Sequence, residues 1–234
     1  MAAAGEPSLA PFLPGRAGPA LIAHGAGNSP RLARAGIESG ADFLEVDLWL
    51  HGGRFEARHE RALYPLPVLF EQWYLRFAPR RPFGLAELLA ENAGRTGIFL
   101  DLKNGGEDAA SLVRRSLREV DNGLLVAASA QQWAILRAVS RLCPEVQTFY
   151  SVDAAAKLDL FLSISERDTH PAGVSCRHQL LTAPVVERLH QRGLLVVAWT
   201  VDETERAAAL AAWGVDGITT HRIAAMREAL GVVR

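Results

Sequence analysis

The sequence predicts an α/β fold, a parallel (β/α)₈ TIM barrel with a small hairpin or lid inserted after the second strand. Short runs rich in Val, Ile, Leu and Phe alternate with stretches of helical periodicity rich in Ala, Leu, Arg and Glu. Eight such units fit into 234 residues, at the compact end of the size range of these barrels. A doubly wound open sheet is the alternative, but no GxGxxG motif follows the first expected strand, so the dinucleotide-binding signature of that fold is missing.

Eight strands and eight helices are expected in strict alternation. The expected strands are 21–24, 43–48, 98–103, 124–129, 148–152, 172–176, 194–201 and 217–221. The expected helices are 29–39, 85–93, 107–120, 131–142, 154–163, 182–192, 203–213 and 223–230. Several of these helices begin at a capping residue and end at glycine, as between Thr182 and Gly193.

Two segments fall outside this rhythm. Residues 1–19 form a lead rich in Pro, Gly and Ala, so the barrel is expected to occupy residues 20–234 as one domain. Residues 49–83 add a short strand, 55–59, and then a Pro-rich stretch at 64–83 that holds six of the 17 aromatic residues of the chain. That stretch has too little periodicity for a barrel helix, and we expect a lid over one end of the barrel.

The charge balance and the cysteines exclude several classes of protein. With 25 Lys and Arg against 26 Asp and Glu, the chain has no bulk charge that would attract nucleic acid. Cys143 and Cys176 lie 33 residues apart without a CxxC motif, which indicates reduced, buried thiols. The N-terminus has no basic signal-like start, and no apolar run reaches the roughly 18 residues of a membrane span. A cytoplasmic protein is therefore expected by default.

Acidic residues interrupt the second strand on one face only. Because side chains alternate along a strand, Phe43, Glu45, Asp47 and Trp49 share one face, and both carboxylates point into the barrel. Burying two carboxylates together costs several kcal/mol unless a positive charge accompanies them. A bound divalent cation would remove this cost, and an Arg or Lys side chain inside the barrel is the alternative.

The third strand brings a further carboxylate and an ammonium group to the same end of the barrel. Alternation places Asp101 and Lys103 on one face of this strand. Three carboxylates offer oxygen ligands to a hard cation, Mg²⁺ or Ca²⁺, while Lys103 would approach the anionic group that the cation polarises. A simple ion pair between Asp101 and Lys103 is the alternative interpretation.

Histidines end the first strand and the inserted strand. His24 precedes the small-residue turn 25–28, and His59 ends the segment FEARHE. A single histidine usually has a structural or surface role, but two beside a carboxylate cluster can serve as acid and base near neutral pH. The combination suggests phosphoryl transfer or hydrolysis. His221, at the end of the eighth strand, and Trp199, which is either a substrate wall or core packing, remain open from the pattern alone.

Six motifs in order resemble those of the glycerophosphodiester phosphodiesterase family. They are LIAHG, GADFLEVDL, RFEARHE, FLDLK, VVAWTVD and GVDGITT, spread from residue 21 to about residue 223. The resemblance implies a catalytic (β/α)₈ barrel with a histidine-bearing hairpin after the second strand. It also implies metal-dependent cleavage of a glycerophosphodiester to glycerol phosphate and an alcohol.

The resemblance assigns roles residue by residue. It implies catalytic positions for His24 and His59, metal-ligand positions for Glu45, Asp47 and Asp101, and substrate-side positions for Lys103 and Trp199. The family more often has Glu where this chain has Asp101, and it follows its first histidine with Arg-Gly. Without that arginine, phosphate binding would depend more on the metal, on Lys103 or on a nearby arginine such as Arg58.

Other features are similar to the related sphingomyelinase D-type phospholipases. These are the run DLKNG and Asn28, which lies four residues after the first histidine and is assigned here to substrate binding. The alternative function is therefore release of a headgroup from a lysophospholipid, and a non-catalytic phosphate-binding barrel is a third hypothesis. The aromatic residues and arginines of 64–83 could make transient contact with a lipid surface or pack over the barrel end.

Overall fold

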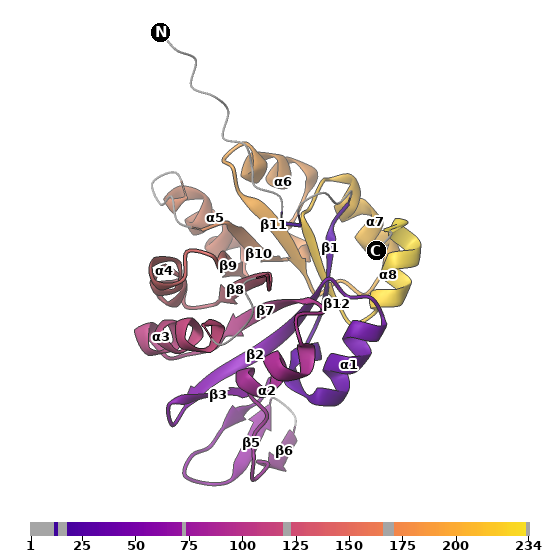
Figure 1. The fold of residues 1–234 in the computed structure, drawn as a ribbon. Helices are drawn as coiled ribbons and strands as arrows, with labels where there is room; N and C mark the ends of the chain where they lie inside the picture. The colour runs from indigo at the N-terminus through magenta and orange to yellow at the C-terminus, as the bar shows by residue number, and fades with distance from the viewer. Residues whose placement is uncertain (1–11, 14–17, 72–73, 119–122, 166–170, 233–234) are drawn as a thin grey trace.

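The computed structural model describes residues 12–13, 18–71, 74–118, 123–165 and 171–232. Eight parallel strands are hydrogen-bonded in the order β1-β12-β11-β10-β9-β8-β7-β2, and pairing of β1 with β2 closes the barrel (Figure 1). The strands are β1 Ala20–Ala23, β2 Phe43–His51, β7 Gly97–Leu102, β8 Val126–Ala130, β9 Gln147–Val152, β10 Gly173–Arg177, β11 Leu195–Trp199 and β12 Gly217–Thr220. The predicted TIM barrel is confirmed.

Helices surround this barrel and cover the outward faces of its strands (Figure 1). They are α1 Pro30–Glu38, α2 Leu85–Asn92, α3 Gly106–Leu117, α4 Trp133–Leu142, α5 Ala155–Ile164, α6 Ala183–His190, α7 Thr204–Ala212 and α8 Ile223–Leu230. Ser29 caps the start of α1 by accepting a hydrogen bond from the Leu32 amide, with Pro30 in the first turn. None of the helices in the described ranges is long and apolar enough to cross a membrane.

An apolar layer fills the barrel interior at the end where the strands begin, and Phe12 of the lead segment belongs to it. Phe12 is buried, stacks on Phe43 at 4.7 Å between ring centroids, and meets the edges of Phe99 and Phe149. This packing fills the end of the barrel at which the strands begin. Most of the lead segment, residues 1–11 and 14–17, lies outside the described residues.

The interior becomes polar toward the carboxyl ends of the strands. The side chains on the inner face above the aromatic layer are Glu45, Asp47, Asp101, Ser129, Ser151, Ser175 and Thr219. Every second residue of a strand faces inward, and these polar side chains come from six of the eight strands, β2, β7, β8, β9, β10 and β12. The polar end therefore lies at the C-terminal face, where barrel enzymes place their active sites.

The insertion after β2 forms more strands than the sequence indicated. β2 pairs antiparallel with β3, Arg54–Ala57, so the expected strand 55–59 is shifted and His59 lies beyond its end. A second, three-stranded antiparallel sheet then follows, made of β4 Arg61–Ala62, β5 Val68–Glu71 and β6 Tyr74–Phe77. Strands of two to four residues are too short to show a period, which explains why they escaped prediction.

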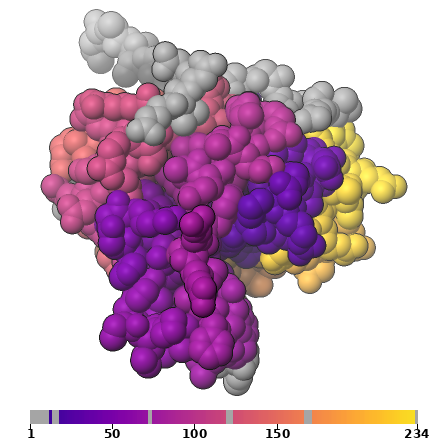
Figure 2. All heavy atoms as spheres, turned by 60° about the horizontal axis from the view of Figure 1, so that its bottom comes forward, coloured from indigo at the N-terminus to yellow at the C-terminus, as the bar shows by residue number. Residues whose placement is uncertain are grey.

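We call residues 52–83 the lobe. Figures 1 and 2 both show its small sheet projecting from the rest of the molecule, at the bottom of each view. Gly84 and α2 follow it and return the chain to the barrel. The lobe is thus attached through β2 and β3 beside the C-terminal end of the barrel.

Candidate active site

The turn after β1 brings the first histidine and Asn28 against the second strand. The short 3₁₀ helix Ala26–Asn28 packs so closely that a Cβ on Gly27 would lie 2.5 Å from Cβ of Val46. This approach lets the Asn28 amide donate to Asp47 Oδ2 at 2.7 Å, while its oxygen accepts from the Asp47 backbone amide at 2.9 Å. Asn28 therefore holds a carboxylate in place, and its expected contact with substrate stays a prediction.

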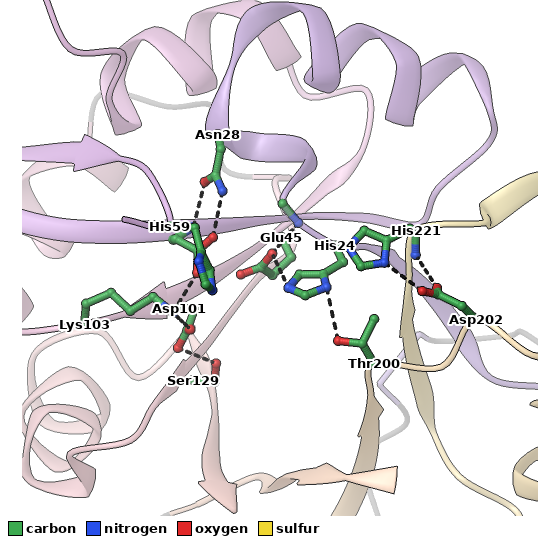
Figure 3. Close-up of polar contacts among 12 residues, drawn as sticks. His24, Asn28, Glu45, His59, Asp101, Lys103, Ser129, Thr200, Asp202 and His221 are labelled. Atoms are coloured by element: carbon green, nitrogen blue, oxygen red, sulfur yellow. Dashed lines mark hydrogen bonds and ion pairs between the residues drawn. The ribbon is translucent and has the colours of Figure 1, made fainter. Parts of the chain in front are cut away.

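Three carboxylates gather above the aromatic layer, as strand alternation predicts, and Figure 3 labels two of them, Glu45 and Asp101. Asp47 and Asp101 are register partners on β2 and β7, and Glu45 precedes Asp47 on the same face. Oxygens of the three residues lie within 4.8 Å of one another. Glu45 and Asp47 are buried, whereas Asp101 is half-buried and accepts a hydrogen bond from Ser129 Oγ at 3.2 Å.

Lys103 bridges two of the carboxylates. Its Nζ lies 2.6 Å from Asp47 Oδ1 and also contacts Asp101 Oδ2. Burial opposes ionisation of Lys103, but the two carboxylates outweigh it and raise the lysine pKa. Burial alone would raise the pKa of Asp47, but Lys103 and the Asn28 amide hold it below its usual range. Both alternatives from the sequence, an ion pair and a carboxylate cluster, are therefore present together.

Glu45 has no cation of its own in this arrangement. Its Oε2 accepts a hydrogen bond from the Gly25 amide at 2.5 Å. Burial, followed by repulsion from Asp47 and Asp101, raises the pKa of Glu45 well above its usual value. One ammonium group for three carboxylates leaves the cluster short of positive charge, and three oxygen donors are the set that Mg²⁺ and Ca²⁺ prefer. The residues present thus fit a hard divalent cation.

His24 lies at the edge of the carboxylate cluster. Its Nε2 is 4.0 Å from Glu45 Oε2, and its Nδ1 is 3.1 Å from Thr200 Oγ1. Burial, followed by the neighbouring His221, lowers the pKa of His24 to about 4. The imidazole is therefore neutral near pH 7 in this environment, a form that accepts a proton.

His59 reaches the same cavity from the lobe. Its Nδ1 lies 2.7 Å from Glu71 Oε1, so a carboxylate of β5 orients the ring. The side chain is about half exposed, in contrast to the more buried His24. Figure 3 shows His59 and Lys103 on one side of Glu45, and His24 and His221 on the other.

A cavity of about 260 Å³ joins these groups. His24, His59, the three carboxylates and Lys103 all line it, and Trp199 forms part of its wall. The Trp199 indole Nε1 is buried without a hydrogen-bond partner among the described residues. Trp199 thus lies at the cavity, as one of its two sequence interpretations proposed, although its contact with substrate stays a prediction.

Sequence reasoning left the role of His221 open and did not identify the hydroxyl groups of this site. His221 Nδ1 donates to Asp202 Oδ2 at 2.9 Å, and the His221 ring centroid lies 4.6 Å from that of His24. The hydroxyls of Ser129, Ser151, Ser175 and Thr219 line the cavity from four other strands. The available signal was weak: a single small polar residue in each apolar strand, at the position where the inner face turns polar.

A protein-family model matches the second half of the chain. The model of the glycerophosphoryl diester phosphodiesterase family matches residues 95–225, which is more than half of the chain and includes Asp101, Lys103 and Trp199. A comparison with curated proteins finds no match.

Solved structures share the fold over nearly the whole chain. A phosphodiesterase of Oleispira antarctica, solved with the product sn-glycerol-3-phosphate, is 18% identical, covers 92% of this chain and 97% of its own, and gives a TM-score of 0.74. A glycerophosphodiester phosphodiesterase of Parabacteroides distasonis is 19% identical, with coverages of 93% and 98% and a TM-score of 0.73. One from Thermotoga maritima is 17% identical, with coverages of 90% and 97% and a TM-score of 0.70.

At these identities the structures establish a common barrel, and the family model adds the sequence evidence. The family model matches residues 95–225 and therefore does not include Glu45, Asp47 and His59. The evidence for these three residues as part of the site comes from the structure. The chain belongs to the glycerophosphoryl diester phosphodiesterase family of enzymes.

Proposed function

We propose that this enzyme is a divalent-cation-dependent phosphodiesterase that hydrolyses glycerophosphodiesters to glycerol phosphate and an alcohol. The observation that carries the proposal is the meeting of three carboxylates, Lys103 and two histidines in one cavity of about 260 Å³. Glu45, Asp47 and Asp101 would hold the cation, Mg²⁺ or Ca²⁺. When bound, such an ion neutralises the anionic phosphodiester oxygens.

The side chains of the cavity supply the remaining chemistry. Lys103 would place its ammonium against the phosphate group, and Trp199 would form a wall for the substrate. Of the two histidines, one would remove a proton from the attacking group and the other would give a proton to the leaving alcohol. Glu71 would accept a hydrogen bond from Nδ1 of His59, which would leave Nε2 for substrate. Asn28 would hold Asp47 in position, because both of its polar atoms contact that residue.

Domain organisation and location form part of the same proposal. We infer that residues 20–234 act as one catalytic domain, with residues 49–83 as its insertion. Cys143 and Cys176 are free and buried, as the sequence predicted. Reduced thiols are typical of cytoplasmic proteins and support that location.

The decisive experiment follows glycerophosphocholine hydrolysis by phosphorus NMR. Activity should vanish with EDTA and return with Mg²⁺ or Ca²⁺, and turnover without any metal would refute the cation site. His24→Ala and His59→Ala should each lower kcat about 10²–10⁴-fold, as expected when an acid or base is lost. His190→Ala is the matched control, because His190 lies at the end of α6 in a pair with Asp216. A His24 or His59 variant with the control's activity would remove that residue from the mechanism.

A second candidate, lysophospholipase D activity, is favoured by the exposed apolar side chains of the lobe beside this cavity. Lysophosphatidylcholine differs from glycerophosphocholine by one acyl chain, and hydrolysis of either substrate would release choline. Parallel assays on lysophosphatidylcholine and glycerophosphocholine separate the candidates. Exclusive cleavage of glycerophosphocholine would reject the second function.

A further inference from the structure

The exposed apolar side chains of the molecule are concentrated on the lobe. Nine large hydrophobic residues are exposed in the described part of the chain, and six of them belong to the lobe. The six are Leu63, Tyr64, Leu66, Tyr74, Leu75 and Phe77. Phe77 is 81% exposed and Leu75 is 70% exposed, the two highest values among the nine. Such clustering marks an interaction surface, since scattered exposed hydrophobic residues are the ordinary case.

The register of the lobe sheet separates an apolar face from a polar face. Directly paired residues share a face, so the pairs Val68–Phe77 and Phe70–Leu75 lie on one side. The pair Glu71–Tyr74 lies on the other side, where Glu71 contacts His59. Through Glu71, the polar face orients a histidine that lines the catalytic cavity. On this apolar face Leu75 and Phe77 of edge strand β6 are exposed, whereas Phe70 of β5 faces a cleft toward the barrel.

The apolar face leads toward the catalytic cavity. A cleft of about 470 Å³ lies between the lobe and the barrel, and Phe70 and Tyr64 line its lobe side. Trp49 and Lys103 line its barrel side. Lys103 lines both this cleft and the catalytic cavity, so the two spaces border the same side chain. A molecule held in this cleft would therefore lie beside the lysine that we place at the phosphate.

The lobe is positively charged, although the chain as a whole carries a formal charge of −1. It contains six arginines against three acidic residues. Arg61, Arg80 and Arg81 are exposed, and the described residues place no carboxylate within ion-pair distance of them. Exposed apolar side chains next to unpaired arginines are the combination that binds an anionic lipid surface. Pairing of two copies through this face would instead bring like charges together.

We propose that the lobe docks on an anionic lipid surface through Leu75, Phe77 and the neighbouring arginines. The evidence for docking is the set of exposed apolar residues and arginines on the lobe, and it does not depend on the proposed function. Its consequence for catalysis rests on the proposed function: the lipid surface presents a lysophospholipid to the cleft, and the phosphodiester reaches the cavity past Lys103. The substrate class is then a phosphodiester that retains an apolar chain.

Flotation of the full chain with lipid vesicles tests the docking without any substrate. The chain should bind vesicles of phosphatidylglycerol and phosphatidylcholine, more weakly those of phosphatidylcholine alone, and less at high salt. Leu75→Ser with Phe77→Ser should lower the affinity at least about tenfold. Arg80→Gln with Arg81→Gln should lower it about fivefold for each arginine. Leu160→Ser, at a residue 52% exposed on α5, is the matched control and should bind as the original chain does.

The outcomes separate this proposal from the proposed function. Equal vesicle binding by the Leu75/Phe77 variant and the original chain would overturn the docking, as would no binding to any vesicle. A dimer that this variant dissociates, without vesicle binding, would assign the face to a second copy and overturn it too. Hydrolysis of dissolved glycerophosphocholine should stay unchanged in the variant, while cleavage of lysophosphatidylcholine in vesicles should fall. If EDTA has no effect on hydrolysis but vesicles bind, the docking stands and the cation site fails.

Discussion

Replacement of Lys103 by Gln tests the electrostatics of the carboxylate cluster most directly. The ammonium lies 2.6 Å from Asp47 Oδ1 and contacts Asp101, while its side chain is only 20% exposed. At an effective dielectric constant of 20, one such contact corresponds to about 6 kcal/mol of Coulomb attraction before desolvation is subtracted. Breaking a buried pair by removing one partner costs about 3–5 kcal/mol, because the remaining carboxylates stay buried without compensation.

Thermal unfolding in EDTA gives the measurement. A loss of about 3 kcal/mol corresponds to a Tm lower by about 6–12 °C for a chain of this size. Mg²⁺ or Ca²⁺ should then stabilise Lys103→Gln more than the original chain, since the cation would restore the missing positive charge. The control is Arg141→Gln, because Arg141 lies 2.6 Å from Glu107, both side chains are more than half exposed, and such surface pairs contribute about 0–1 kcal/mol. Equal Tm losses for the two variants, or no added effect of metal on the first, would refute this reasoning.

Three further predictions concern other parts of the molecule. Phe12→Ala should lower the free energy of unfolding by about 3–5 kcal/mol, because the ring is buried against other aromatic rings. Phe77→Ala, at an exposed ring, should change this free energy by less than about 0.5 kcal/mol. Denaturant titration measures both values. Gly27→Ala should cost about 1–3 kcal/mol and weaken cation binding in calorimetry, because its Cβ would displace the turn that carries Asn28; unchanged affinity would contradict this. The hydrogen bond to Asp216 raises the pKa of His190 against the effect of burial, so this pair contributes up to about 1 kcal/mol of stability. That contribution is complete below the ordinary histidine pKa of about 6.5 and is lost as the pH rises through the raised pKa of His190. His190→Asn should remove this part of the pH dependence of the free energy of unfolding.

The N-terminal half of the site illustrates how far sequence reasoning reaches. Strand alternation alone placed Glu45, Asp47 and Asp101 on inner faces, since the period of two is a local property of the backbone. Their proximity followed because β2 and β7 are neighbouring parallel strands of a closed barrel. The contact of Asn28 with Asp47 did not follow, because it depends on how closely a turn packs on β2.

The sequence by itself determined the barrel, its order of strands and helices, and the acidic face of its second and third strands. These properties follow from local periodicity and from the short connections of a βα repeat. Only the tertiary structure decided the pairing of His59 with Glu71, of His221 with Asp202, and the packing of Phe12 beneath the barrel. Each of these contacts joins segments whose relative positions depend on the closure of the barrel or the folding of the lobe. A local sequence pattern contains no information about how far apart these segments lie in the fold. The same alternation of residues is compatible with many arrangements of loops and inserted strands.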